Sequence, residues 1–202
     1  IPSEFRLKGL SSEYEFMGEW RLPLSIPDAS GITFLHGDGA HSGLVIASDK
    51  KNAIHRVTID RGKRRLLVGP AIEIRGLPEG RRDFEGLAFD RHSGTLFIGC
   101  EEDSNVLRTT LFGRLLGRAQ SEIKVDDNDG IEAVALRRLK DGTPLLYVFK
   151  ERNGTTGRQP VVHCYDIQES PLKLTRRGEP FRVPVALVDQ TGAVASGQKL
   201  FL

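Results

Sequence analysis

The sequence predicts an all-β protein of the β-propeller class, built from four-stranded blades, and a repeated pattern carries this prediction. A short cassette of a turn, a carboxylate and an apolar run occurs at 28–34, 83–89 and 129–135. Each copy is followed by a second apolar run that ends in an acid and then by a third run. The copies recur roughly every 50 residues, which is the length of one propeller blade.

The residue types in these runs favour strands over helices. They are rich in Val, Ile, Phe and Tyr and are bounded by Gly, Asn and Asp, as strands commonly are. A helical repeat would show apolar residues at spacings of three and four, and a parallel β-helix would have a shorter period. The repeat therefore indicates propeller blades.

The repeat also predicts the organisation of the chain, with 1–202 forming a single, partial propeller domain. About three and a half blades do not close a ring, so we expect missing residues or a second chain to complete it. The expected segments are an outer strand of a preceding blade at 13–26, blade one at 27–75, blade two at 80–126, blade three at 127–184 and the start of blade four at 188–202.

Two outer strands are predicted at 71–74 and 122–125. The apolar run at 111–116 fits either a strand or a helical turn, and the sequence does not decide between them.

The composition fits a soluble globular protein, with 39% hydrophobic and 28% charged residues. A net charge of +2 is too small to indicate nucleic acid as a partner. No apolar run approaches the roughly 18 residues of a membrane span, and no signal peptide opens the chain, although a removed export signal remains open. Cys100 and Cys164 lie in predicted strands of different blades, so we expect buried thiols and no disulfide.

The acids of the cassettes are the main candidate site. The first strand of each propeller blade lines the central channel, so residues at its start face one mouth. Converging carboxylates repel each other, and a bound Ca²⁺ with six to eight oxygen ligands would neutralise them. The acids expected at this mouth are Asp28, Asp83, Glu85, Asp129 and Glu132 from the first strands, with Asp49, Glu101 and Glu151 from the second strands.

The predicted calcium ligands are Asp28, Glu85, Glu132, Glu101 and Glu151. The alternative is that such acids cap turns by accepting backbone hydrogen bonds, and this stays open for Asp28, Asp83 and Asp129. Glu85 and Glu132 favour a functional role, because Glu at the start of a channel strand has no preference for turns.

Cations accompany these acids in the repeat. Carboxylates with a metal and nearby Lys and Arg suit a phosphate-bearing substrate, whereas the alternative is a mixed-charge loop surface. The predicted substrate contacts are Lys50, Lys51, Arg82, Lys150 and Arg152. The five histidines give no metal-ligand spacing, and no nucleophile elbow, P-loop or dinucleotide fingerprint is present, so the catalytic residues are not identified.

The runs 84–89, 93–98 and 130–135 resemble the phytase-like propeller family, often described by an esterase-like activity of phytase. Blade one, at 27–31 and 47–52, is also similar to the first blade of the alkaline β-propeller phytases. The resemblance implies a six-bladed ring, calcium at the channel mouth, hydrolysis of phosphomonoesters and an exported protein.

By this resemblance Asp28, Glu85 and Glu132 would lie beside the calcium, and Lys50 and Lys51 would contact phosphate. The sequence departs from the phytases at Ala29-Ser30, where those enzymes carry further acids.

Three functions are therefore considered. The first is a calcium-dependent phosphoesterase that acts on a small phosphomonoester at the channel mouth. The second is a metal-dependent lactonase or esterase of propeller type. The third is a binding or scaffolding propeller without enzyme activity. The sequence does not identify the substrate or the oligomeric state.

Overall fold

The computed structural model describes residues 21–37, 40–49, 51–78, 83–123, 130–150 and 161–182, together with the backbone of 194–196 and 199–201. These residues form strands and turns, and none of them is helical. Accordingly, the described part of the chain has no helix long and apolar enough to cross a membrane.

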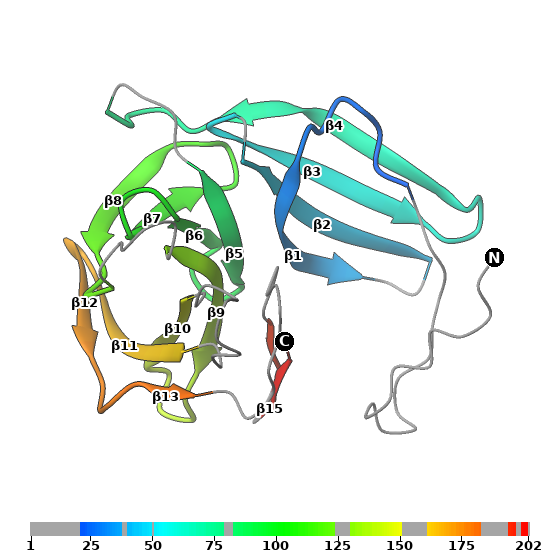
Figure 1. The fold of residues 1–202 in the computed structure, drawn as a ribbon. Coiled ribbons are helices and arrows are strands. Elements are labelled where there is room, and N and C mark those ends of the chain that lie inside the picture. The colour runs from blue at the N-terminus through cyan, green and yellow to red at the C-terminus, as the bar shows by residue number, and fades with distance from the viewer. Residues whose placement is uncertain are drawn as a thin grey trace.

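The strands form successive antiparallel sheets in chain order (Figure 1), which confirms the predicted all-β fold. The first sheet contains β1 (Ala29–Gly37), β2 (His41–Ser48), β3 (Ala53–Asp60) and β4 (Arg65–Glu73). The second contains β5 (Phe84–Asp90), β6 (Thr95–Cys100), β7 (Asn105–Thr110) and β8 (Leu115–Gln120). The third contains β9 (Ile131–Arg138), β10 (Pro144–Lys150), β11 (Val161–Glu169) and β12 (Leu172–Arg176). The short strand β13 (Phe181–Arg182) also pairs with β11. A separate hairpin is formed by β14 (Val194–Ser196) and β15 (Lys199–Phe201).

The sheets are arranged as blades of a propeller. The first strands of the three sheets, β1, β5 and β9, are neighbours, and β14 lies beside β9. Figure 1 shows these strands at the inner side of the arrangement, with β4, β8 and β12 further out. The described residues therefore contribute three four-stranded blades of a partial propeller. The six-bladed ring stays a prediction.

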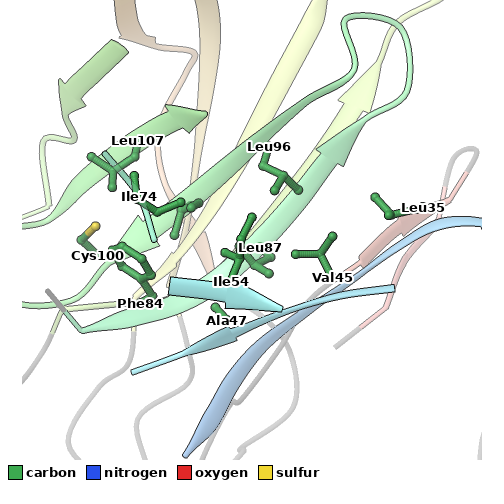
Figure 2. Close-up of a cluster of buried hydrophobic side chains, with 11 residues drawn as sticks. Leu35, Val45, Ala47, Ile54, Ile74, Phe84, Leu87, Leu96, Cys100 and Leu107 are labelled. Carbon is green, nitrogen blue, oxygen red and sulfur yellow. The ribbon is translucent and has the colours of Figure 1, made fainter. Parts of the chain in front are cut away.

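Each pair of neighbouring blades shares an apolar core. Between blades one and two, Val45 and Ile54 of one sheet pack with Leu87 and Leu96 of the next (Figure 2). Between blades two and three, Phe97 belongs to a second cluster with several side chains of blade three, namely Val134, Leu146, Val148, Tyr165 and Leu172. Because a middle blade is covered on both faces, its strand β6 is buried along its whole length.

The small residue in the cassette allows these blades to approach closely. A Cβ on Gly86 would lie 2.8 Å from the carbonyl carbon and the Cα of Ala133 in the next blade. A Cβ on Gly31 would lie 3.0 Å from the carbonyl oxygen of Glu85. The inner strands therefore meet backbone to backbone at these positions, which a larger side chain would separate.

Two details of the sequence prediction are wrong. The outer strand of blade two is β8. Of the predicted strand at 122–125, residues 122 and 123 are not in a strand, and 124 and 125 lie outside the described residues. The run at 111–116 is neither one strand nor a helical turn. Gly113 has a positive φ of 76° and forms a tight turn, in which the Thr110 N–H donates to the Arg114 carbonyl at 2.9 Å. In blade one, the outer strand β4 already begins at Arg65.

The expected strand at 13–26 is described only in its last part. Residues 13–20 lie outside the described residues, and 21–26 contain a turn instead of a strand. The Ile26 N–H donates to the Pro23 carbonyl at 3.0 Å, which closes this turn. Pro23 has no N–H to donate to a strand partner, which disfavours a regular strand there.

Candidate functional site

Backbone hydrogen bonds bring the acids of the first and second strands together. In blade one, the Asp49 N–H donates to the Asp28 carbonyl at 3.1 Å. In blade two, the Glu101 N–H donates to the Asp83 carbonyl at 2.9 Å. The residue after the second strand thus lies beside the residue before the first strand. We call this rim, with Asp28, Asp49, Asp83, Glu85, Glu101 and Glu132, the acidic mouth.

The blades also contact each other at the acidic mouth. The Ser30 hydroxyl of blade one donates to the Phe84 carbonyl of blade two. A Cβ on Gly130, at the start of blade three, would lie 2.6 Å from the carbonyl oxygen of Glu101. The starts of β1, β5 and β9 therefore form one continuous rim.

A β-bulge occurs at this rim in each of the three blades. In blade two, Phe84 is opposite Cys100 and Gly86 is opposite Gly99, so Glu85 is the extra residue. In blade three, Glu132 is extra, because Ile131 is opposite Lys150 and Ala133 is opposite Phe149. A bulge bends the strand and changes the direction of a side chain, and bulges are common beside active sites.

Blade one has its register shift between Ala29 and Ile32, so Ser30 and Gly31 take the place of the glutamates. Asp28, just before them, has a positive φ of 44°, a conformation that Asp tolerates better than most residues. The same backbone feature thus presents a Glu in two blades and a hydroxyl in the third.

The environment of the mouth is only partly open to water. One side-chain oxygen of Asp49 and one of Asp83 are shielded from solvent. Glu85, Glu101 and Glu132 are half-buried. Because a carboxylate loses hydration energy on burial, such a rim needs compensating donors or cations.

Two of the predicted cations lie near this rim. Lys150 is opposite Ile131 at the start of β9 and is half-buried. Lys51 is exposed in the turn after β2, where its N–H donates to the Ser48 carbonyl at 3.4 Å. The remaining predicted residues, Lys50, Arg82, Asp129, Glu151 and Arg152, lie outside the described residues.

The donor chemistry of the mouth suits calcium, but the described acids alone do not complete a site. Carboxylate and backbone carbonyl oxygens are the ligands that Ca²⁺ prefers. Among the residues that the structure describes, no group of three or more His, Cys, Asp or Glu is placed to hold a metal ion. The predicted set includes Glu151, which is not described, so the calcium site stays a prediction.

A hollow of about 600 Å³ lies in blade one, between the turn that precedes β3 and the segment that follows β4, and its lining begins two residues after Asp49 of the acidic mouth. Its charged and polar lining residues are Lys51, Asn52 and Glu73. Its other lining residues are Ala53, Ala71, Ile74, Gly76, Leu77 and Pro78. This volume is in the range of sites for small molecules.

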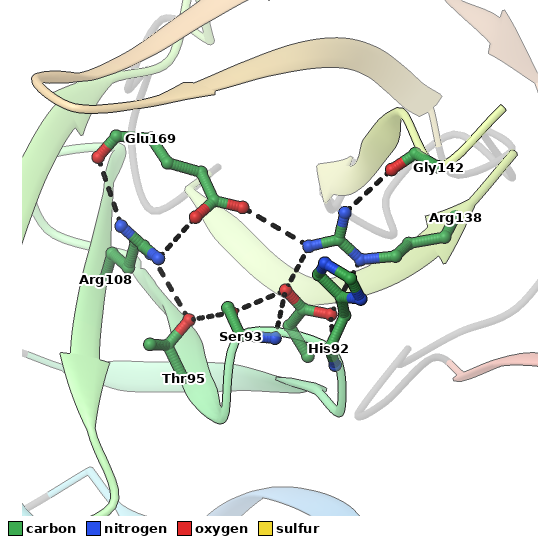
Figure 3. A network of polar contacts seen from close by, with 8 residues as sticks. His92, Ser93, Thr95, Arg108, Arg138, Gly142 and Glu169 are labelled. Atoms are coloured by element: carbon green, nitrogen blue, oxygen red, sulfur yellow. Dashed lines mark hydrogen bonds and ion pairs between the residues drawn. The ribbon is translucent and has the colours of Figure 1, made fainter.

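A second polar cluster lies at the other end of the inner strands, where β5 and β9 end (Figure 3). Arg138 donates to buried Asp90 through Nε at 2.9 Å and is also 3.3 Å from a Glu169 oxygen. Arg108 of blade two forms an ion pair with Glu169 of blade three. The network therefore joins two neighbouring blades.

The partners of Asp90 keep it ionised. Burial alone would raise the pKa of its carboxyl, but hydrogen bonds from Arg138, Ser93 and the His92 N–H, with the charge of Arg138, lower it to about 2. Because these partners satisfy the carboxylate, its role is structural. The sequence prediction missed this cluster, although the Asp-x-x-Ser-Gly turn at 90–94 was a usable signal.

The fold of the described residues is that of a partial β-propeller, and the acids described above lie where its inner strands begin. No protein-family model matches the chain, and no curated protein matches it. Solved structures that it is similar to include Kuenenia stuttgartiensis hydrazine synthase, with 13% identity, a TM-score of 0.49 and coverage of 89% of this chain and 42% of that one.

Two further solved structures that the chain is similar to are a WD40 domain and a sialidase. For the WD40 β-propeller domain of Doa1, identity is 9%, the TM-score is 0.38, and 72% of this chain and 53% of that chain are covered. For a mutant of the NanB sialidase from Streptococcus pneumoniae, identity is 9%, the TM-score is 0.43, and coverage is 79% and 24%.

The chain spans less than half the length of hydrazine synthase. These similarities concern the fold alone, and the phytase-like family stays a prediction.

Proposed function

We propose that this propeller binds Ca²⁺ at the acidic mouth and hydrolyses a small phosphomonoester there. The observation that carries the proposal is the β-bulge repeated in three blades, which places Glu85 and Glu132 as the extra residues of neighbouring inner strands. A bulge that served only the strand geometry would not need the same acid in two blades.

The residues of the chain have separate roles in this proposal. Glu85 and Glu132 would provide carboxylate oxygens from neighbouring blades, and Asp28, Glu101 and Glu151 are the other predicted ligands. Because no three of the described acids are placed to hold one ion, the proposal requires Glu151 or a movement of these side chains on binding. Bound calcium would polarise a phosphoryl oxygen and neutralise the rim. Lys150 and Lys51 hold the phosphate oxygens by charge-assisted hydrogen bonds.

The hollow beside Lys51 supports a small-molecule substrate rather than a macromolecular one. It is large enough for the alcohol part of a phosphate ester, and its lining combines apolar residues with Lys51, Asn52 and Glu73. We propose that the phosphate lies towards the acidic mouth and the alcohol part lies in this hollow.

The experiment measures phosphate release from p-nitrophenyl phosphate and from phytate, first in EDTA and then with added Ca²⁺. We expect calcium-dependent release that the E85Q/E132Q double variant lacks. The control is Glu179→Gln, because the Glu179 side chain is 89% exposed and lies beyond the outer strand β12 of blade three.

If the calcium-loaded protein hydrolyses lactones but no phosphate ester, the phosphoesterase proposal is wrong and the lactonase alternative is favoured. No hydrolysis of either class, in a protein that calcium does not stabilise, would contradict the proposal and favour a binding propeller.

A further inference from the structure

The turn between β7 and β8 presents an exposed aromatic ring at the outer side of the propeller. Phe112 is 69% exposed, the second most exposed large hydrophobic residue among those that the structure describes. The turn lies against the residue that follows β4, because Arg75 and Arg114 form a backbone bridge between blades one and two. We call Arg75, Phe112, Gly113 and Arg114 the outer-edge tip.

The outer-edge tip is held by a dense set of hydrogen bonds. The Gly113 N–H donates to the Thr110 carbonyl at 3.1 Å, and the Phe112 and Arg114 N–H groups donate to the Thr110 hydroxyl at 3.3 and 3.1 Å. From the neighbouring blade, the Arg75 N–H donates to the Gly113 carbonyl at 2.7 Å. An aromatic ring on such a turn loses little conformational entropy when it binds a partner.

Two arginines accompany this ring, and neither has a counter-ion among the residues that the structure describes. Neither Arg75 nor Arg114 forms an ion pair with any residue that the structure describes, whereas Arg108, Arg118 and Arg138 each do. Within the described part of the chain, the Arg75 guanidinium donates to the Phe112 carbonyl, at 3.4 Å. Adjacent like charges repel each other, so an anionic group between them would be favourable.

We propose that the outer-edge tip docks a protein partner through an apolar contact ringed by carboxylates. The Phe112 ring enters the apolar part, while Arg75 and Arg114 each bind a carboxylate through two parallel hydrogen bonds. Aromatic and Arg residues are the types that dominate protein–protein hot spots. The tip lies by the outer strands and next to the hollow, because Arg75 stands between the lining residues Ile74 and Gly76.

A membrane surface fits the same residues less well. Two basic residues contribute about 1 kcal/mol each near an anionic bilayer, and firm attachment needs a larger basic cluster or an apolar helix face. The described outer-edge tip offers one ring and two cations on a rigid turn.

The test uses a fluorescent peptide in which Leu is flanked on each side by three Glu, measured by anisotropy at low salt. Its controls carry Gln in place of Glu, or Ser in place of Leu. We expect binding only with Glu and Leu present, and at least about tenfold weaker binding for Phe112→Ser and for the R75Q/R114Q double variant. Lys63→Gln and Leu67→Ser, on the β3–β4 turn and β4, are the matched charge and apolar controls and leave the affinity unchanged.

Several results would overturn the proposal. One is equal binding of the Glu and Gln peptides. Another is that Lys63→Gln and Leu67→Ser weaken binding of the Glu peptide as much as the variants of the outer-edge tip do. A third is binding to phosphatidylserine vesicles that depends on Phe112 while the peptide does not bind. Unchanged melting of the Phe112→Ser protein verifies that loss of binding does not reflect unfolding.

Discussion

Replacing Gly86 by alanine tests the close approach of blades two and three. The added Cβ would lie 2.8 Å from two backbone atoms of Ala133. Backbone atoms cannot rotate away as a side chain can, so β9 must move by about 1 Å or more, with the apolar cluster behind it. Overpacking of this kind costs about 1–3 kcal/mol, and we expect the upper end.

The expected effect on melting follows from the size of the chain. For 150–250 residues, 1 kcal/mol lowers the melting temperature by about 2–4 °C, so Gly86→Ala should lower it by about 6–12 °C. Differential scanning calorimetry measures this shift. Gly31→Ala should have a smaller effect, because its Cβ would meet the Glu85 carbonyl oxygen at 3.0 Å.

Gly62→Ala is the matched control, because its Cβ would have only an ordinary contact, at 3.6 Å from an Asp60 oxygen. It should change the melting temperature by about 1 °C or less. Equal effects of Gly86→Ala and Gly62→Ala would refute the close packing of the inner strands.

Three further predictions concern other parts of the molecule. The pKa of Asp90 in the folded protein is about 2, below the ordinary 3.8, so its network stabilises the folded state by about 2 kcal/mol above pH 4, and this stabilisation is lost as the pH falls towards 2. Urea unfolding between pH 5 and pH 2 should therefore show that the free energy of unfolding depends less on pH in Asp90→Asn than in the unmodified protein. Gly113→Ala should lower the free energy of unfolding in urea by about 3 kcal/mol, because its φ is +76° and the added Cβ would lie 3.0 Å from Ile72 Cγ2. Gly94→Ala has a similar φ of +69° but open space around the Cβ, so it should lower the free energy of unfolding by about 1 kcal/mol. Equal losses in the two variants would exclude a packing role for the β7–β8 turn. Cys100 is fully buried, and burial raises the pKa of the Cys164 thiol. Iodoacetamide at pH 8 should therefore label both cysteines at least about tenfold more slowly in the folded protein than in urea. Fast labelling of the folded protein would contradict their burial.

The sequence predicted the inner strands well because their signal is local. Each cassette combines a turn, a small residue and an apolar run, and Gly31 and Gly86 occupy equivalent places against the next blade. The free state of both cysteines was also predicted, although Cys164 is only half-buried. The β7–β8 turn was missed because apolar pairs stand on both sides of Gly113-Arg114, so 111–116 was interpreted as one run instead of two strand ends and a turn.

The site was predictable only in part, for a physical reason. The sequence indicated Glu85 and Glu132, but not that both are bulge residues, because a bulge depends on the pairing register with the next strand. The cluster around Asp90 was missed because Arg108 and Glu169, which are 61 residues apart, meet only after two blades have packed.

The central claim, a calcium ion bound by carboxylates of the acidic mouth, is tested most directly by thermal melting in EDTA and then with added Ca²⁺. A ligand at a hundredfold excess over its Kd stabilises the folded state by about 2.7 kcal/mol, which for this chain is about 5–11 °C. We predict such a shift for the unmodified protein and for Glu179→Gln, and its loss in E85Q/E132Q. An equal shift in E85Q/E132Q, or no shift in the unmodified protein, would contradict calcium binding at the acidic mouth.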